Sequence, residues 1–77
     1  MNDAIQRGAL FYHTKAEHTY VVLGVGVIEA DLTPAVIYTR WRPQPEDNKD
    51  VWIRPRAEFQ DGRFAHCGWD FDYARLK

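Results

Sequence analysis

Arginines and aromatic residues gather in the second half of the chain, and their types suggest an anion-binding site. Trp52 and Arg54 alternate along an apolar segment; if Val51 and Ile53 face the core of a strand, Trp52 and Arg54 point outward together. An arginine fork holds phosphate or carboxylate, and a tryptophan or tyrosine face stacks on a planar base. The pattern predicts binding of a nucleotide, a nucleic-acid single strand or an acidic peptide. The candidate ligand-binding residues are Tyr38, Arg40, Trp52, Arg54 and Arg56.

These residues also have a structural interpretation. In it, Trp52 covers the mouth of a barrel, and the arginines form ion pairs with nearby carboxylates. The carboxylate candidates are Glu29, Asp50 and Glu58. The strand before Trp52 also has two solutions. If Val36 faces the core, so does Tyr38, whereas a buried Ile37 would expose Tyr38 and Arg40 beside Trp52.

Metal binding and catalysis find little support in the sequence. The residues that could ligate a metal are His13, His18, His66 and Cys67. Their spacing matches no established metal-binding pattern, and residues 66 and 67 of an extended segment point to opposite sides. The chain has no serine nucleophile, and the carboxylates of Asp70 and Asp72 would need a pocket that shifts their pKa values. We therefore predict a non-enzymatic protein without metal or cofactor.

The elements that position these residues are predicted to be short strands. Residues 19–28 are rich in β-branched side chains and contain Gly24 and Gly26, which favours a strand with a bend or bulge. Val21 and Val25 are expected on one face of this strand, together with Leu23 and Val27. Further strands are predicted at 9–13, 35–41, 51–54 and 63–66, with a helical turn at 56–60, a loop at 42–50 and turns at 29–34 and 61–62.

Five or six short strands without an amphipathic helix predict a mainly β fold, a small bent barrel of the SH3-like type. An α+β roll is the alternative if either terminus is helical. We expect one domain over residues 1–77, with its core at 8–66 and an aromatic and acidic tail at 68–77. The tail could close the barrel, or it could pair with a sheet edge of another protomer or of a partner protein.

Composition narrows the classes of function. The 77 residues carry 10 Lys and Arg against 11 Asp and Glu, a formal net charge of -1, so binding to duplex DNA is not expected. No apolar run reaches the roughly 18 residues of a membrane helix. Residues 1–7 lack the pattern of a secretory signal, and one cysteine cannot form an intramolecular disulfide. A cytoplasmic protein without membrane contact is expected.

Several short motifs carry a family resemblance. They are Y-V-V-L-G at 20–24, V-I-Y at 36–38, and W-I-R-P at 52–55 with Phe59 four residues after the proline. F-Y-H-T-K at 11–15 and R-F at 63–64 stand at either end. Together these segments, within residues 8–64, resemble the domain-of-unknown-function family 1653 of small bacterial and phage proteins. The chain departs from that family in its longer proline-rich segment after Trp41 and in Glu58. The resemblance implies a compact β-rich domain and no catalytic residues.

The function predicted from these features is a non-enzymatic binding module for a small anionic ligand, with a nucleotide favoured. By analogy with small phage proteins, it could sequester a nucleotide signal at a subunit interface, which makes a homo-oligomer an option for so small a chain. An SH3-like protein-interaction domain is the first alternative, and a single-stranded nucleic-acid binder is the second.

Overall fold

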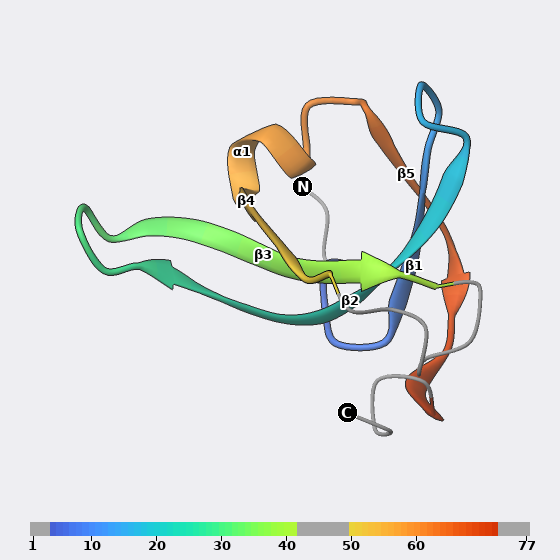
Figure 1. The fold of residues 1–77 in the computed structure, drawn as a ribbon, viewed down its shortest axis with the longest axis horizontal. Coiled ribbons are helices and arrows are strands. Elements are labelled where there is room, and N and C mark those ends of the chain that lie inside the picture. Colours follow the sequence, from blue (N-terminus) through green and yellow to red (C-terminus); the bar gives the residue numbers. More distant parts are fainter. Residues whose placement is uncertain (1–3, 42–49, 73–77) are drawn as a thin grey trace.

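The computed structural model describes residues 4–41 and 50–72 (Figure 1). In chain order the elements are β1 Ala9–His13, β2 His18–Ile28, β3 Thr33–Arg40, β4 Trp52–Pro55, α1 Arg56–Phe59 and β5 Phe64–Trp69. The five strands form one sheet in the order β4-β3-β2-β1-β5, and every neighbouring pair is antiparallel. No helix in the described ranges is long and apolar enough to cross a membrane.

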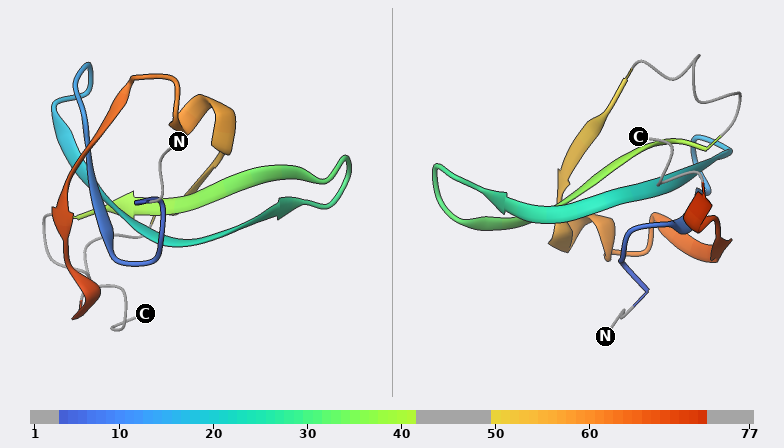
Figure 2. Two further views of the ribbon diagram at one scale, coloured as in Figure 1. Left: turned by 180° about the vertical axis from the view of Figure 1, so that it is seen from behind. Right: turned by 90° about the horizontal axis from the view of Figure 1, so that it is seen from below.

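The prediction of a mainly β fold of five or six short strands is confirmed in its class, and the described residues form five strands, each of which lies where the sequence placed it to within a few residues. The sheet curls but stays open, because β4 and β5 form its two edges rather than pairing with each other (Figure 2). A closed SH3-like barrel is therefore not shown. Helix in the described residues is limited to short segments, and α1 has four residues. The structure is therefore closer to the mainly β expectation than to an α+β roll.

One face of the sheet carries the main core, and we call it the core face. Its buried members are Ile5, Ala9, Phe11, Val22, Val36, Tyr38, Phe59 and Phe64. Phe59 comes from α1, which follows Pro55 directly because proline ends the strand pairing and fits the start of a helix. The rings of Phe59 and Phe64 stack at 4.2 Å, and the edge of Phe11 meets Phe59 at 4.9 Å. This cluster of rings holds α1 and β5 against the sheet.

A β-bulge in β2 corrects the expected face pattern. Val22 pairs with Tyr38 and Gly24 with Ile37, so Leu23 is an extra residue on its strand. An extra residue reverses the alternation beyond it. Val25 consequently lies opposite Val36 on the core-face side, whereas Val21 packs with Leu10 on the other side. The prediction that Val21 and Val25 share a face is wrong, although the glycines did mark the bend.

The first part of the predicted tail packs on its own chain. β5 extends to Trp69, which pairs with Ala9, and the Asp70 N–H donates to the Gly8 carbonyl at 2.7 Å. Trp41 Nε1 donates to Asp70 Oδ2 at 2.8 Å. These contacts hold Trp69 and Asp70 beside the start of β1 and the end of β3. The predicted 42–50 loop, apart from Asp50, and residues 73–77 of the tail lie outside the described residues.

We expect Gly8→Ala to destabilise the fold by about 1–3 kcal/mol, because a residue held in a sparsely populated backbone region carries strain of that order. Gly8 has φ +93°, and an added Cβ would meet Phe71 Cδ1 at 2.7 Å. Gly62 offers a matched control, since its φ is +108° but nothing lies within 4 Å of its Cβ position. Urea denaturation of both variants separates backbone strain from the Phe71 contact. Equal losses would contradict a role for Phe71 at this position.

Candidate functional site

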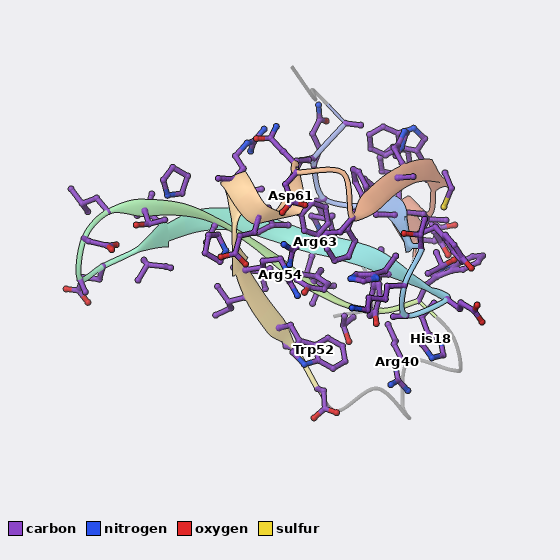
Figure 3. The ribbon with its side chains drawn as sticks, turned by 90° about the horizontal axis from the view of Figure 1, so that it is seen from above. His18, Arg40, Trp52, Arg54, Asp61 and Arg63 are labelled. Atoms are coloured by element: carbon purple, nitrogen blue, oxygen red, sulfur yellow. The ribbon has the colours of Figure 1, made fainter. Side chains whose placement is uncertain are left out.

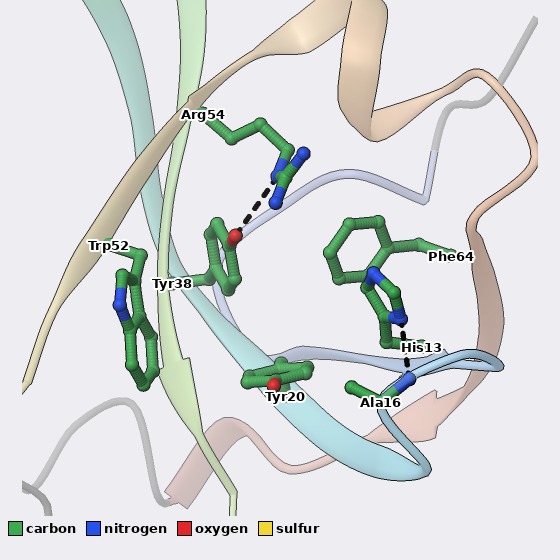
Figure 4. A pocket seen from close by; sticks show the side chains of 7 residues that line it. All are labelled: His13, Ala16, Tyr20, Tyr38, Trp52, Arg54 and Phe64. Atoms are coloured by element: carbon green, nitrogen blue, oxygen red, sulfur yellow. Dashed lines mark hydrogen bonds between the residues drawn. The ribbon is translucent and has the colours of Figure 1, made fainter.

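A pocket of about 290 Å³ opens on the core face, where the sheet curls (Figure 4). Five aromatic rings, one guanidinium and one alanine line it, and they come from all five strands and the β1–β2 turn. The lining residues are His13, Ala16, Tyr20, Tyr38, Trp52, Arg54 and Phe64. A pocket of this size is large enough for a small planar group.

The position of Trp52 and Arg54 corrects the expected orientation of β4. Cross-strand partners share a face, and Trp52 pairs with Tyr38 while Arg54 pairs with Val36. Both partners face the core, so Trp52 and Arg54 lie on the core face too. Ile53 is 62% exposed and points to the other side, so the condition that Ile53 faces the core is not met. The large indole of Trp52 packs against the main core instead, which covers more apolar area than an isoleucine could.

The ambiguous strand β3 adopts the first of its two solutions. Val36 is fully buried and Tyr38 is 5% exposed, so Tyr38 is a wall of the pocket and not a surface residue. Arg40 lies two residues further on, opposite Tyr20, and is exposed. Figure 3 shows Arg40 at the end of the sheet, near His18. Of the five predicted ligand-binding residues, Tyr38, Trp52 and Arg54 meet in the pocket, and Arg40 and Arg56 are not in its lining.

Among the residues that the structure describes, Arg54 is the one permanently charged cation in the lining of the pocket. Its Nε donates to the Tyr38 hydroxyl at 3.1 Å, and its Nη1 reaches Glu58 Oε1 at 3.3 Å one helical turn on. The guanidinium carbon lies 5.6 Å from the centre of the Phe64 ring. The hydrogen bond to Tyr38 raises the pKa of Arg54. The pairing with Glu58 is one of those anticipated by the structural interpretation, and among the described residues Nη2 donates to no acceptor.

His13 adds a second polar group, which the sequence had suggested only as a possible metal ligand. Its Nδ1 accepts a hydrogen bond from the Ala16 N–H at 3.0 Å, within the β1–β2 turn. In a neutral imidazole, an accepting Nδ1 leaves the proton on Nε2, which is then a donor. Its ring packs edge-on against Phe64 at 4.7 Å, so its orientation is fixed. His13 and Arg54 thus place N–H donors on the lining of one pocket.

Tyr20 holds the aromatic walls together. Its ring meets Tyr38, Trp52 and Phe64 at centroid distances of 5.5, 5.9 and 6.0 Å, with interplanar angles of 88°, 90° and 68°. Edge-to-face contacts of this kind are favourable and fix ring orientation. Rings held in this way offer preformed surfaces for a planar group, while Arg54 offers charge. The pocket suits a ligand that combines an aromatic ring with an anion.

Metal-ligating residues do not gather in the part of the chain that the structure describes, where no group of three or more His, Cys, Asp or Glu side chains could hold an ion. Cys67 is exposed, and desolvation raises the pKa of its thiol. A raised pKa lowers the fraction of reactive thiolate at neutral pH.

Comparisons with family models, with curated proteins and with solved structures find no match for this chain. The resemblance to the domain-of-unknown-function family 1653 therefore stays a prediction.

Proposed function

We propose that the protein is a non-enzymatic binding module whose pocket takes a small anionic ligand with a planar ring, such as a nucleotide. The observation that carries this proposal is Arg54 on the wall of a pocket otherwise lined mainly by aromatic rings. Tyr38 orients the guanidinium, and Phe64 packs beneath it. A preoriented arginine loses less conformational freedom when it binds an oxyanion.

The ligand would meet both kinds of surface at once. Its ring would stack on the exposed face of Trp52 or Tyr20, and stacking on an aromatic side chain contributes about 1–3 kcal/mol per base. Its phosphate or carboxylate would accept hydrogen bonds from Arg54 and from His13 Nε2. The pair formed by Arg54 and Glu58 is solvent-exposed on the Glu58 side, so an anion can compete for the guanidinium at small cost.

Thermal unfolding in the presence of small ligands tests this function. The set contains inorganic phosphate, a nucleoside, the matching nucleoside monophosphate and cyclic nucleotides. A ligand at one hundred times its Kd stabilises the folded state by about 2.7 kcal/mol, which raises the Tm of so small a domain by roughly 10–20 °C. We expect the nucleotides to stabilise more than phosphate or nucleoside alone. No shift with any of them would count against the proposal.

The SH3-like barrel and the cytoplasmic location also stay proposals. The order of five short antiparallel strands and their curl support the first. The single exposed thiol of Cys67 supports the second, because an unpaired exposed cysteine suits a reducing compartment.

A further inference from the structure

Half of the β2–β3 hairpin projects from the rest of the molecule as an arm (Figures 1 and 2). We define the arm as residues 23–34. β1 pairs with β2 only as far as Val21, and the Gly8 N–H donates to the Val22 carbonyl at 2.8 Å. Beyond Val22, no strand of the described residues pairs with that edge of β2. The outward N–H and C=O groups of the arm therefore form an open strand edge.

The two edges of the arm differ in how well they are protected. On the β3 side, β4 covers the strand from Ala35 onward, and Pro34 has no N–H to offer. On the β2 side, residues 21–28 contain no charge and no proline. Val25 and Val27 are 52% and 60% exposed on this strand. Proteins usually use charged residues, proline, or a covering helix or loop to protect a long apolar strand edge from pairing. An edge without any of these can pair with another strand.

We propose that this edge of β2 pairs antiparallel with the same edge of a second copy, about a twofold axis at Gly26. The proposal is independent of the pocket. In this alignment Val25 of one copy faces Val27 of the other, and Gly24 faces Ile28. Directly opposed residues must share a face of the sheet. Val25 and Val27 lie on one face and Gly24 and Ile28 on the other, so the pairing is self-consistent.

Charge favours a second copy in this orientation. The tip of the arm carries Glu29 and Asp31. Asp31 Oδ1 accepts hydrogen bonds from the Thr33 hydroxyl at 2.6 Å and from the Thr33 N–H at 3.0 Å. These bonds lower the pKa of Asp31, so its carboxylate is charged at neutral pH. Antiparallel pairing at Gly26 sets Glu29 opposite Leu23 of the other copy, next to the start of β1, where Arg7 precedes Gly8. Each acidic tip thus comes to the end of β1 that Arg7 precedes in the sequence. A parallel arrangement would place the two acidic tips side by side.

The size of the chain adds a reason for such pairing. A 77-residue chain buries a smaller fraction of its surface on folding than a larger domain does, and self-association is a common way for small domains to gain stability. Pairing two arms would extend the sheet across both copies. It would bury Val25 and Val27 against each other twice, by symmetry.

Sedimentation equilibrium over a range of protein concentrations tests the proposal. The wild-type chain of 9.0 kDa is expected to show a reversible monomer–dimer equilibrium. The variant Val25→Lys/Val27→Lys would set lysines opposite lysines, and we expect it to be monomeric throughout. The variant Val25→Lys/Val27→Glu would set each lysine opposite a glutamate, and we expect it to regain the dimer. Both positions are exposed, so circular dichroism should show the fold retained.

Ile53→Lys is the matched control, because Ile53 is an equally exposed apolar residue on β4, at the other side of the sheet. It should dimerise like the wild type. A wild-type protein that stays monomeric at every concentration overturns the proposal and leaves the edge to a strand of a different protein. Dimers of the Lys/Lys variant as stable as those of the wild type also overturn it, as does a Lys/Glu variant that stays monomeric.

Discussion

Replacement of Phe59 by alanine is expected to lower the free energy of unfolding by about 3–5 kcal/mol. Phe59 is 1% exposed, and its ring contacts Phe64, Phe11 and Tyr38. Its removal would leave a cavity between α1 and the sheet that the surrounding rings cannot fill. Domains of this size have a total stability of only about 4–12 kcal/mol, so the variant should be close to unfolded at 37 °C. Urea denaturation followed by tryptophan fluorescence measures the loss.

Phe71→Ala provides the control for Phe59→Ala. Phe71 is 57% exposed, stacks on Trp69 at 5.1 Å and lies over Gly8. The same chemical change should therefore cost much less there, on the order of 1 kcal/mol. A loss below about 1 kcal/mol in Phe59→Ala would show that α1 does not belong to the cooperative core.

The second large effect is expected in ligand binding. Arg54→Met keeps much of the side-chain volume but removes the guanidinium from the pocket. Hydrogen bonds to a charged group contribute about 1.5–3 kcal/mol, so the affinity for a nucleotide that stabilises the wild type should fall roughly 10- to 150-fold. Isothermal titration of both proteins with that nucleotide measures the change. Arg54→Lys keeps the charge but loses the fork and the Tyr38 contact, and should lie between them.

Two further variants show whether Arg54 acts through position or through charge alone. Arg7→Gln removes one positive charge from the far end of β1 and should leave the affinity unchanged. Tyr38→Phe removes only the hydroxyl that accepts from Arg54 Nε, and should weaken binding about three- to tenfold by loosening the guanidinium. A nucleotide affinity that is the same in Arg54→Met and wild type would place the ligand elsewhere.

The sequence was sufficient for the strands and for part of the site. The β-branched run of β2 and the proline after Arg54 are local signals, and they located β2, β4 and α1 well. The face of β4 was mispredicted because V-W-I-R has large apolar residues on both sides of a strand. Alternation alone then allows two solutions. The choice depends on pairing with Val36 and Tyr38, which is a contact between distant segments.

His13 and Tyr20, the pocket residues that the sequence did not predict for this site, also depend on contacts between distant segments. His13 faces Phe64 because β1 pairs with β5, and Tyr20 is set beside Tyr38 by the pairing of β2 with β3. None of these neighbours is close in sequence. The bulge at Leu23 could not be predicted from regular alternation of side chains along the strand, although Gly24 and Gly26 indicated where the strand would deviate. Arg40 was expected at the site from its spacing to Tyr38, but it lies beyond the end of the pocket.

The pairing of the first strand with the last has a consequence for how the chain matures. β1–β2 and β2–β3 are hairpins whose strands are close in sequence, so they can close quickly and at small entropic cost. β5 must instead find β1 across almost the whole chain, and it brings Phe64 with it. A nascent chain that has left the ribosome only as far as β3 would have a hairpin with an uncovered apolar face and no pocket. The pocket forms only after synthesis of the segment from β4 to β5, because this segment supplies Trp52, Arg54 and Phe64 and covers the apolar face of the hairpins.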